Sequence, residues 1–143
     1  MTVAAFKGLK CDYSKIGIIL INRRFNIGRL QQSELIGGYL AERDTLTGIV
    51  VVMDSRRPFM PTDEWVIDFL NTRPVRLHLL LNKCDQLNNQ QKKETLLKVK
   101  ARAAEMGPHV TVQLFSGLKR IGVDELRETL ERWIRREDTP VVP

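Results

Sequence analysis

The sequence contains few of the residues that cross-link a chain or bind metals. Its 143 residues include two cysteines, Cys11 and Cys84, and two histidines. Two cysteines cannot form a disulfide framework or supply paired CxxC metal ligands. We therefore expect a protein of the reducing cytoplasm, without a metal cluster.

Long apolar runs are also missing. The longest, Ile16–Ile21 and Ile49–Met53, fall far short of the roughly 18 residues that a membrane-spanning helix needs. Lys7 and Lys10 precede the first run, and no small-residue cleavage site follows it. We expect neither a membrane span nor a signal peptide.

The composition that remains is typical of one globular domain, with 43% hydrophobic and 28% charged residues. The net charge of +6 is uneven, because residues 1–30 hold six Lys/Arg and one acidic residue, whereas the rest holds 17 and 16. We expect a basic N-terminal segment over 1–30, an α/β body over 31–136 and a frayed tail over 137–143.

From residue 46 onwards, β-branched apolar runs alternate with amphipathic segments. The runs predict strands over Leu46–Met53, Val75–Leu81 and Val110–Leu114. Three helices are expected between and after them, one capped by Thr62, one opened by Asn88-Asn89 and one following Gly122, with an earlier helix over Gln31–Arg43. This alternation predicts right-handed βαβ units and a parallel sheet.

The sequence also predicts which face of one helix lies inward, and it contains one further strand-like run. In the helix that ends at Met106, the side chains expected to face inward are Leu96, Leu97, Ala103 and Ala104. In the N-terminal segment only Ile16–Ile21 is strand-like.

A polar tetrapeptide follows the second predicted strand. Asn82-Lys83-Cys84-Asp85 has the form NKxD, and ligands of parallel sheets bind beyond the carboxyl ends of the strands. The Asp85 carboxylate can accept the paired N1–H and N2–H donors of guanine, for which adenine has no equivalent. Ser116-Gly117, one βαβ unit later, offers backbone N–H groups towards guanine O6. The alternative interpretation is a polar turn that caps a helix.

Two longer motifs are more specific. Met-Asp-x-Arg-x-Pro occupies residues 53–58, and Phe-Ser-x-Leu-Lys occupies residues 115–119. Together with NKxD they make the stretch from Glu34 to Ile134 resemble the EngB (YsxC/YihA) family of Ras-like GTPases.

The resemblance implies a three-layer Ras-like P-loop NTPase fold and a bacterial cytoplasmic protein that binds GTP or GDP with Mg²⁺. It further implies a role in assembly of the large ribosomal subunit, in cell division and in septation. The nucleotide-binding residues would be Asn82, Lys83, Cys84, Asp85, Phe115, Ser116 and Gly117.

The phosphate-binding half of such a protein is missing from the sequence. A P-loop needs GxxxxGK[ST], and no Gly-Lys dipeptide occurs anywhere in the chain. The family's Asp-x-Pro-Gly element and its switch threonine cannot be located either. We expect an N-terminally truncated fold without the P-loop strand, without Mg²⁺ ligands and unable to hydrolyse GTP alone. In the Ras-like sheet that the resemblance implies, the P-loop strand lies beside the strand at Ile49–Met53. We expect Ile16–Ile21 to pair there or nearby instead, which would give a four-stranded sheet. A disrupted gene and a diverged N-terminus both remain open, and an unpaired sheet edge would favour self-association.

Other function classes have less support. The basic segment could make the chain a non-enzymatic RNA or ribosome interaction module, with Arg23, Arg24 and Arg29 contacting phosphates. The same charges could simply form a solvated face. For another kind of α/β enzyme, Asp54 and Asp85 are possible acids, but no nucleophile–base pair accompanies them.

Overall fold

The structure, a computed structural model, describes residues 16–20, 47–72 and 75–135. The predicted helix over Gln31–Arg43, most of the basic segment 1–30 and the tail 137–143 lie outside the described residues. The described elements are, in order, β1 (Ile16–Leu20), β2 (Gly48–Asp54), α2 (Pro61–Asn71), β3 (Arg76–Asn82), the short 3₁₀ helix η2 (Cys84–Gln86), α3 (Asn89–Met106), β4 (Val110–Leu114) and α4 (Val123–Arg135).

The four described strands form one parallel sheet in the order β1-β2-β3-β4. The predicted α/β architecture is therefore confirmed. β1 pairs with β2 from Ile16 opposite Gly48 to Leu20 opposite Val52. The strand predicted from the N-terminal apolar run thus exists and completes a four-stranded sheet.

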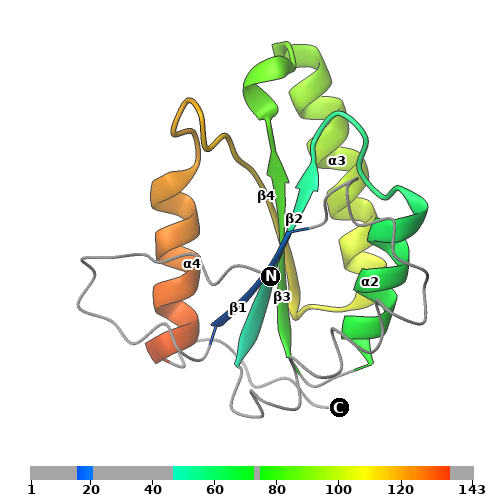
Figure 1. Cartoon of the computed structure of the whole chain (residues 1–143), viewed down its shortest axis with the longest axis vertical. Coiled ribbons are helices and arrows are strands. Elements are labelled where there is room, and N and C mark those ends of the chain that lie inside the picture. Colours follow the sequence, from blue (N-terminus) through cyan, green and yellow to red (C-terminus); the bar gives the residue numbers. More distant parts are fainter. Residues whose placement is uncertain (1–15, 21–46, 73–74, 136–143) are drawn as a thin grey trace.

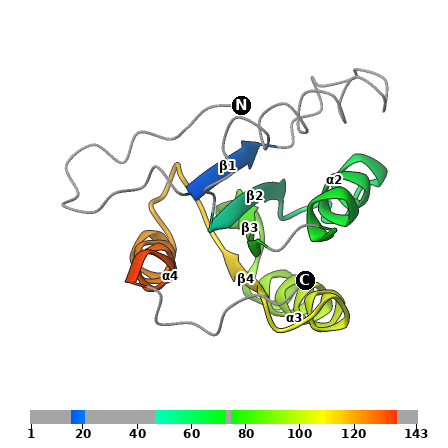
Figure 2. The same ribbon diagram turned by 90° about the horizontal axis from the view of Figure 1, so that it is seen from below.

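Helices cover both faces of this sheet. Figures 1 and 2 show α4 on one face and α2 with α3 on the other, which gives three layers. Successive side chains of β2 point to opposite faces of the sheet. Ile49, Val51 and Met53 therefore join the core under α2 and α3. Val50 points the other way, into the cluster under α4.

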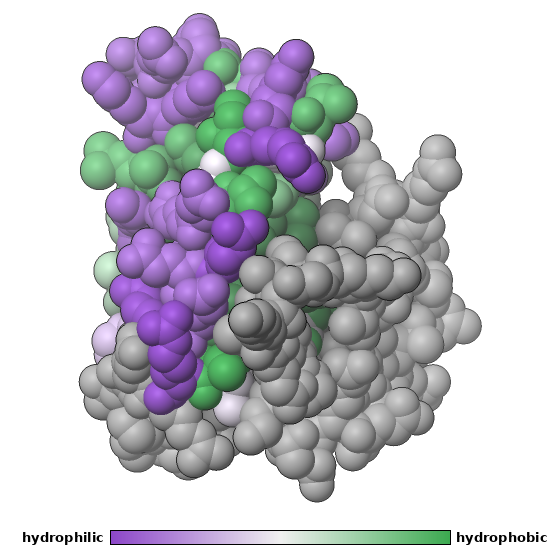
Figure 3. Space-filling model, turned by 90° about the vertical axis from the view of Figure 1, so that its left-hand side faces the viewer, coloured by the Kyte–Doolittle hydropathy of each residue, from purple (hydrophilic) through white to green (hydrophobic). Residues whose placement is uncertain are grey.

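The helix predicted after Gly122 is α4, and it packs one face against the sheet. Leu126, Leu130 and Trp133 are buried against the sheet. Figure 3 views the molecule from the side of this helix, where hydrophilic residues gather on the outer surface and hydrophobic residues form a band beside them. None of the helices in the described part is long and apolar enough to cross a membrane.

The start of α2 differs from the prediction. The helix begins at Pro61 with Met60 as its N-cap, so the prediction that Thr62 caps it was wrong. The Asp63 carboxylate accepts a hydrogen bond from the Met60 N–H at 3.0 Å. An acid within the first turn therefore stabilises this helix start in place of a hydroxyl before it.

The inner face of α3 was predicted only in part. The helix begins after Asn88 and ends before Gly107, as expected. Its buried residues, however, are Val99 and Ala103, whereas Leu97 is 74% exposed and Ala104 is also exposed. The inward placement of Leu97 and Ala104 was therefore wrong, because the contact face runs through Val99.

Candidate guanine-nucleotide site

Three loops meet at the carboxyl ends of β2, β3 and β4, and backbone hydrogen bonds join them. The Ser55 N–H donates to the Asn82 carbonyl at 2.8 Å, and the Phe115 N–H donates to the Leu81 carbonyl at 2.8 Å. The Cys84 N–H donates to the Phe115 carbonyl at 3.1 Å. The main chain therefore holds the NKxD segment and the Phe-Ser-Gly segment together, as the sequence predicted.

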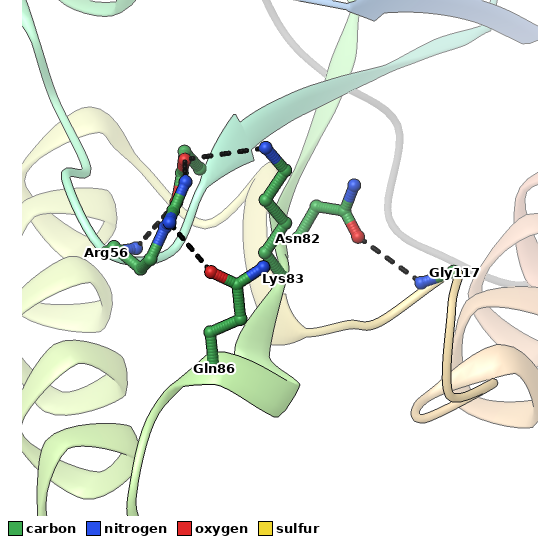
Figure 4. Close-up of polar contacts among 6 residues, drawn as sticks. Arg56, Asn82, Lys83, Gln86 and Gly117 are labelled. Atoms are coloured by element: carbon green, nitrogen blue, oxygen red, sulfur yellow. Dashed lines mark hydrogen bonds and ion pairs between the residues drawn. The ribbon is translucent and has the colours of Figure 1, made fainter.

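Asn82 connects these two segments through its side chain. It is the last residue of β3, and its Oδ1 accepts a hydrogen bond from the Gly117 N–H at 3.3 Å. Figure 4 shows the Asn82 side chain reaching towards Gly117. The amide thus fixes the distance between the NKxD segment and the loop after β4.

Asp85 is oriented by a serine from the second loop. The Ser116 hydroxyl donates to Asp85 Oδ1 at 2.7 Å and accepts from the Lys119 N–H at 3.0 Å. Ser116 is fully buried, while Asp85 is partly exposed. With one oxygen held by Ser116, the other carboxylate oxygen and its lone pairs are available to an incoming pair of N–H donors.

Lys83, between Asn82 and Cys84, has a left-handed backbone conformation. Its φ of 63° lies in the left-handed region, which a residue with a side chain adopts at a cost. Its Nζ lies 4.0 Å from Asp54 Oδ2. The aliphatic stem is half-exposed and can cover the face of a planar ligand.

The carboxylate of Asp54 is held mainly by Arg56. Arg56 donates from Nε to Asp54 Oδ1 at 3.0 Å and from Nη2 to Oδ2 at 2.7 Å. These hydrogen bonds hold the pKa of Asp54 below its usual value. Arg56 Nη1 also donates to Gln86 Oε1 at 2.7 Å, so one guanidinium joins the loop after β2 to η2 (Figure 4).

This Arg56–Gln86 link was not predicted from the sequence. Arg56 belongs to the Met-Asp-x-Arg-x-Pro motif, but the motif alone does not show which group the guanidinium contacts. Gln86 lies outside every motif that was identified. A pair exposed to solvent contributes little to stability, so its effect is on the geometry of the two loops.

Two of the predicted site residues lie mainly inside the protein. Cys84 is fully buried, and burial raises the pKa of its thiol. Phe115 is half-buried and packs against the cluster under α4. Both residues face the interior and anchor the two segments, whereas Lys83 and Gly117 are exposed.

A divalent metal finds no ready site in this part of the chain. Within residues 16–20, 47–72 and 75–135, no three His, Cys, Asp or Glu side chains cluster as potential ligands. The carboxylate of Asp54 is already paired with Arg56. The described residues therefore do not fit Mg²⁺.

Comparison with known proteins shows which proteins this chain resembles. No family model matches the chain. It is 38% identical over 117 residues to the probable GTP-binding protein EngB of Aromatoleum aromaticum, a match that covers 80% of this chain and 54% of the relative. The EngB protein of Dechloromonas aromatica is 43% identical over 108 residues, covering 74% of this chain and 49% of the relative. The chain thus spans about half the length of these curated relatives.

Solved structures support the fold. The complex of SsGBP with GDP matches with a TM-score of 0.63 at 18% identity, over 87% of this chain and 50% of that one. Translation elongation factor SelB from Methanococcus maripaludis, in complex with a GTP analogue, matches with a TM-score of 0.58 at 19% identity, over 72% of this chain and 23% of that one. Era, in complex with MgGDPNP and a segment of 16S ribosomal RNA, matches with a TM-score of 0.55 at 20% identity, over 78% of this chain and 38% of that one.

At such identities the structural likeness establishes the fold alone, the α/β fold of P-loop GTPases. The sequence matches are closer, at 38% and 43% identity over 117 and 108 residues. Over the segment that it shares with these relatives, the chain belongs to the EngB family.

Proposed function

We propose that this chain binds guanine nucleotides mainly through the base. The observation that carries the proposal is the pair of contacts between the two loops, Ser116 to Asp85 at 2.7 Å and Gly117 to Asn82 at 3.3 Å. These contacts pre-organise a carboxylate acceptor beside an exposed backbone turn. A site that is arranged before the ligand arrives loses less entropy on binding.

The chemistry of the site selects guanine over adenine. Guanine offers two adjacent N–H donors to Asp85, and its O6 would accept from the Gly117 N–H, sharing this donor with Asn82 Oδ1. Adenine would leave the carboxylate without a partner, at the cost of a lost charge-assisted hydrogen bond. Lys83 would cover one face of the ring with its stem.

The phosphates are expected to contribute little. The chain has no Gly-Lys dipeptide, so it lacks the loop that cradles phosphates and places a lysine on them. Phosphoryl transfer depends almost entirely on such positioning and charge stabilisation. We therefore propose weak nucleotide binding, and no GTP hydrolysis by this chain alone.

The wider role follows from family membership. We propose that the chain acts in the cytoplasm on assembly of the large ribosomal subunit, and through it on cell division and septation. What supports this is the resemblance of the 53–58, 82–85 and 115–119 motifs to the EngB family. Ribosomal RNA is then the expected partner of the nucleotide-bound form.

A second candidate function rests on charge. Residues 1–30 hold six Lys/Arg and one acid, which suits contact with RNA phosphates. Arg23, Arg24 and Arg29 lie outside the described residues. Deleting residues 1–30 would also remove β1, so replacing these three arginines by glutamine is the cleaner test. Loss of salt-dependent RNA binding, with guanine binding retained, would support the RNA module.

The test of the proposed function compares ligands that differ in base and in phosphate. Titration should show GDP binding at least about 10-fold more tightly than ADP, the value of one charge-assisted hydrogen bond. Guanosine should bind nearly as well as GDP, since the described site contacts only the base.

The matching variant is Asp85→Asn. An amide offers one donor and one acceptor, which matches the edge of xanthine, so the preference should move from GDP to XDP by about 10-fold or more. Asp124→Asn is the control, because Asp124 is an exposed acid in α4 that pairs with Arg127. An unchanged preference in Asp85→Asn would contradict the proposed function.

A further inference from the structure

A polar network lies inside the hydrophobic interface between the sheet and α4. His78 and Gln113 are only 2% and 1% exposed. They share this layer with Leu80, Leu130 and Trp133, and the His78 ring meets the Trp133 ring edge-on. Buried polar groups are costly unless they are hydrogen-bonded, so their partners indicate what the network does.

The partners fix the proton positions. Gln113 Nε2 donates to the carbonyls of Leu114 at 3.1 Å and Gly122 at 2.9 Å. Its Oε1 is therefore an acceptor, and His78 Nε2, 2.8 Å away, is the donor. His78 Nδ1 then accepts from the Thr111 hydroxyl at 2.6 Å. Every polar atom of the His78 ring and the Gln113 amide is used.

The network ends at the base of the loop that follows β4. Gly122 has a φ of 81°, and a Cβ there would lie 2.5 Å from the Leu114 carbonyl oxygen and 2.7 Å from Gln113 Nε2. The Gly122 carbonyl also accepts from the Leu126 N–H at 3.0 Å, in the first turn of α4. Gln113 thus holds the point where the loop ends and α4 begins.

The loop above this point is closed upon itself. Ser116 and Ile121 exchange two backbone hydrogen bonds of 3.0 Å each. The Lys119 N–H bonds the Ser116 hydroxyl, which in turn donates to Asp85. The backbone hydrogen bonds of Phe115 to Leu81 and Cys84 fix one end of this turn, and Gly122 fixes its other end.

We propose that Gln113, held by His78, is a positioning residue for the base site. It fixes Gly122, and through the closed turn it sets where Ser116 and Gly117 meet Asp85 and Asn82. The effect on ligand binding rests on the proposed function, whereas the effect on the loop does not. An apolar side chain at 113 would fill the core more simply, but it could not hold the Gly122 carbonyl.

The test uses Gln113→Met and the control Thr111→Val. Methionine keeps the length of the side chain and loses the three hydrogen bonds to His78, Leu114 and Gly122. Valine removes only the hydroxyl on the far side of His78 and leaves Gln113 bonded to Gly122. Both variants should lower the melting temperature. Only Gln113→Met should speed amide exchange at Gly117, Lys119 and Ile121, by about 10-fold or more, the equivalent of one lost hydrogen bond.

Ligand binding gives the second readout. Gln113→Met should weaken GDP binding and reduce the preference for GDP over ADP, whereas Thr111→Val should leave both as in the wild type. A purely structural role predicts equal effects in the two variants, which would overturn the proposal. If the wild type itself shows no guanine preference, the proposed function fails, and amide exchange still decides the positioning role.

A measurement on the unaltered chain covers the case in which Gln113→Met does not fold. The side-chain amide protons of Gln113 and the backbone amides of Lys119 and Ile121 should open with the same free energy in native-state exchange, because one event releases both. Rapid exchange of the loop amides while the Gln113 side chain stays protected would show that the loop moves independently, and would overturn the proposal.

Discussion

At the scale of single residues, backbone strain is concentrated at one end of the sheet. In the described ranges, the residues other than glycine with a positive φ are Phe59 at 58°, Lys83 at 63° and Arg120 at 55°. Each lies in the loop that follows a different strand, β2, β3 or β4. Strained residues persist only where the surroundings over-determine them, and they cluster at functional sites. The backbone geometry therefore supports the proposal that the nucleotide site lies at this end of the sheet.

Asp63 makes one helix start sensitive to pH. The residue is only 4% exposed, and desolvation raises the pKa of its carboxyl group from 3.8 to about 6 despite the hydrogen bond from Met60. The folded protein thus holds this proton more tightly than the unfolded chain does. The stabilising contribution is complete below pH 3.8 and is lost as the pH rises through about 6.

Asp63→Asn should remove this dependence and keep the cap, because the amide oxygen can still accept from the Met60 N–H. The free energy of unfolding of the variant, relative to the wild type, should rise between pH 4 and pH 6 and then level off. The gain should be at most about 3 kcal/mol. Urea unfolding at several pH values measures it, with Asp68→Asn as a control for an exposed acid of the same helix. A constant difference across this range would contradict the prediction.

At the scale of elements, strands were easier to predict than helix faces. Continuous runs such as Gly48–Asp54 and Arg76–Asn82 are buried along nearly their whole length, so no choice of face was needed. In α3, apolar residues occur on more than one side, and Leu96 and Leu97 cannot both face the sheet. Local periodicity could not show that the contact face runs through Val99.

In the candidate site, too, some contacts could be predicted from the sequence and others could not. The NKxD and Phe-Ser-Gly segments were predicted and do meet, because parallel strands bring their carboxyl ends together. The contact of Arg56 with Gln86 and the network from His78 to Gly122 were not predicted. Arg56 and Gln86 are 30 positions apart and His78 and Gln113 are 35 positions apart, and neither pair has a sequence spacing that indicates contact.

The start of α3 offers a direct test of an element that was predicted correctly. Asn88 Oδ1 accepts from the Gln91 N–H at 2.8 Å, and Gln91 Oε1 accepts from the Asn88 N–H at 2.9 Å. Asn88→Ala should lower the free energy of unfolding by about 1 kcal/mol, the usual value of an N-cap. Gln90→Ala, which breaks only an exposed contact to Glu94, should cost less than about 0.5 kcal/mol. Equal losses in urea unfolding would show that the cap contributes nothing.

At the scale of the whole molecule, the N-terminal strand determines whether β2 has a free edge. The described strands run β1-β2-β3-β4, so β1 covers the outer edge of β2. α4 secures this side, because Ile16 shares a buried cluster with Leu126 and Trp133. Packing is close here, since a Cβ on Gly48 would lie 2.4 Å from Trp133 Cε3. An uncovered β2 would present a row of unpaired backbone groups, which promotes association between chains.

Ile16→Asp should therefore detach β1 and change the association state of the protein. The charge would enter a cluster in which Ile16 is only 3% exposed, and an unpaired buried charge is strongly destabilising. We expect rapid amide exchange over Gly17–Leu20 and a shift to larger species in sedimentation velocity. Ile16→Val, which removes one methylene, should lose about 1 kcal/mol and sediment as the wild type does. If Ile16→Asp kept the wild-type size and stability, β1 would not contribute to covering the edge of the sheet.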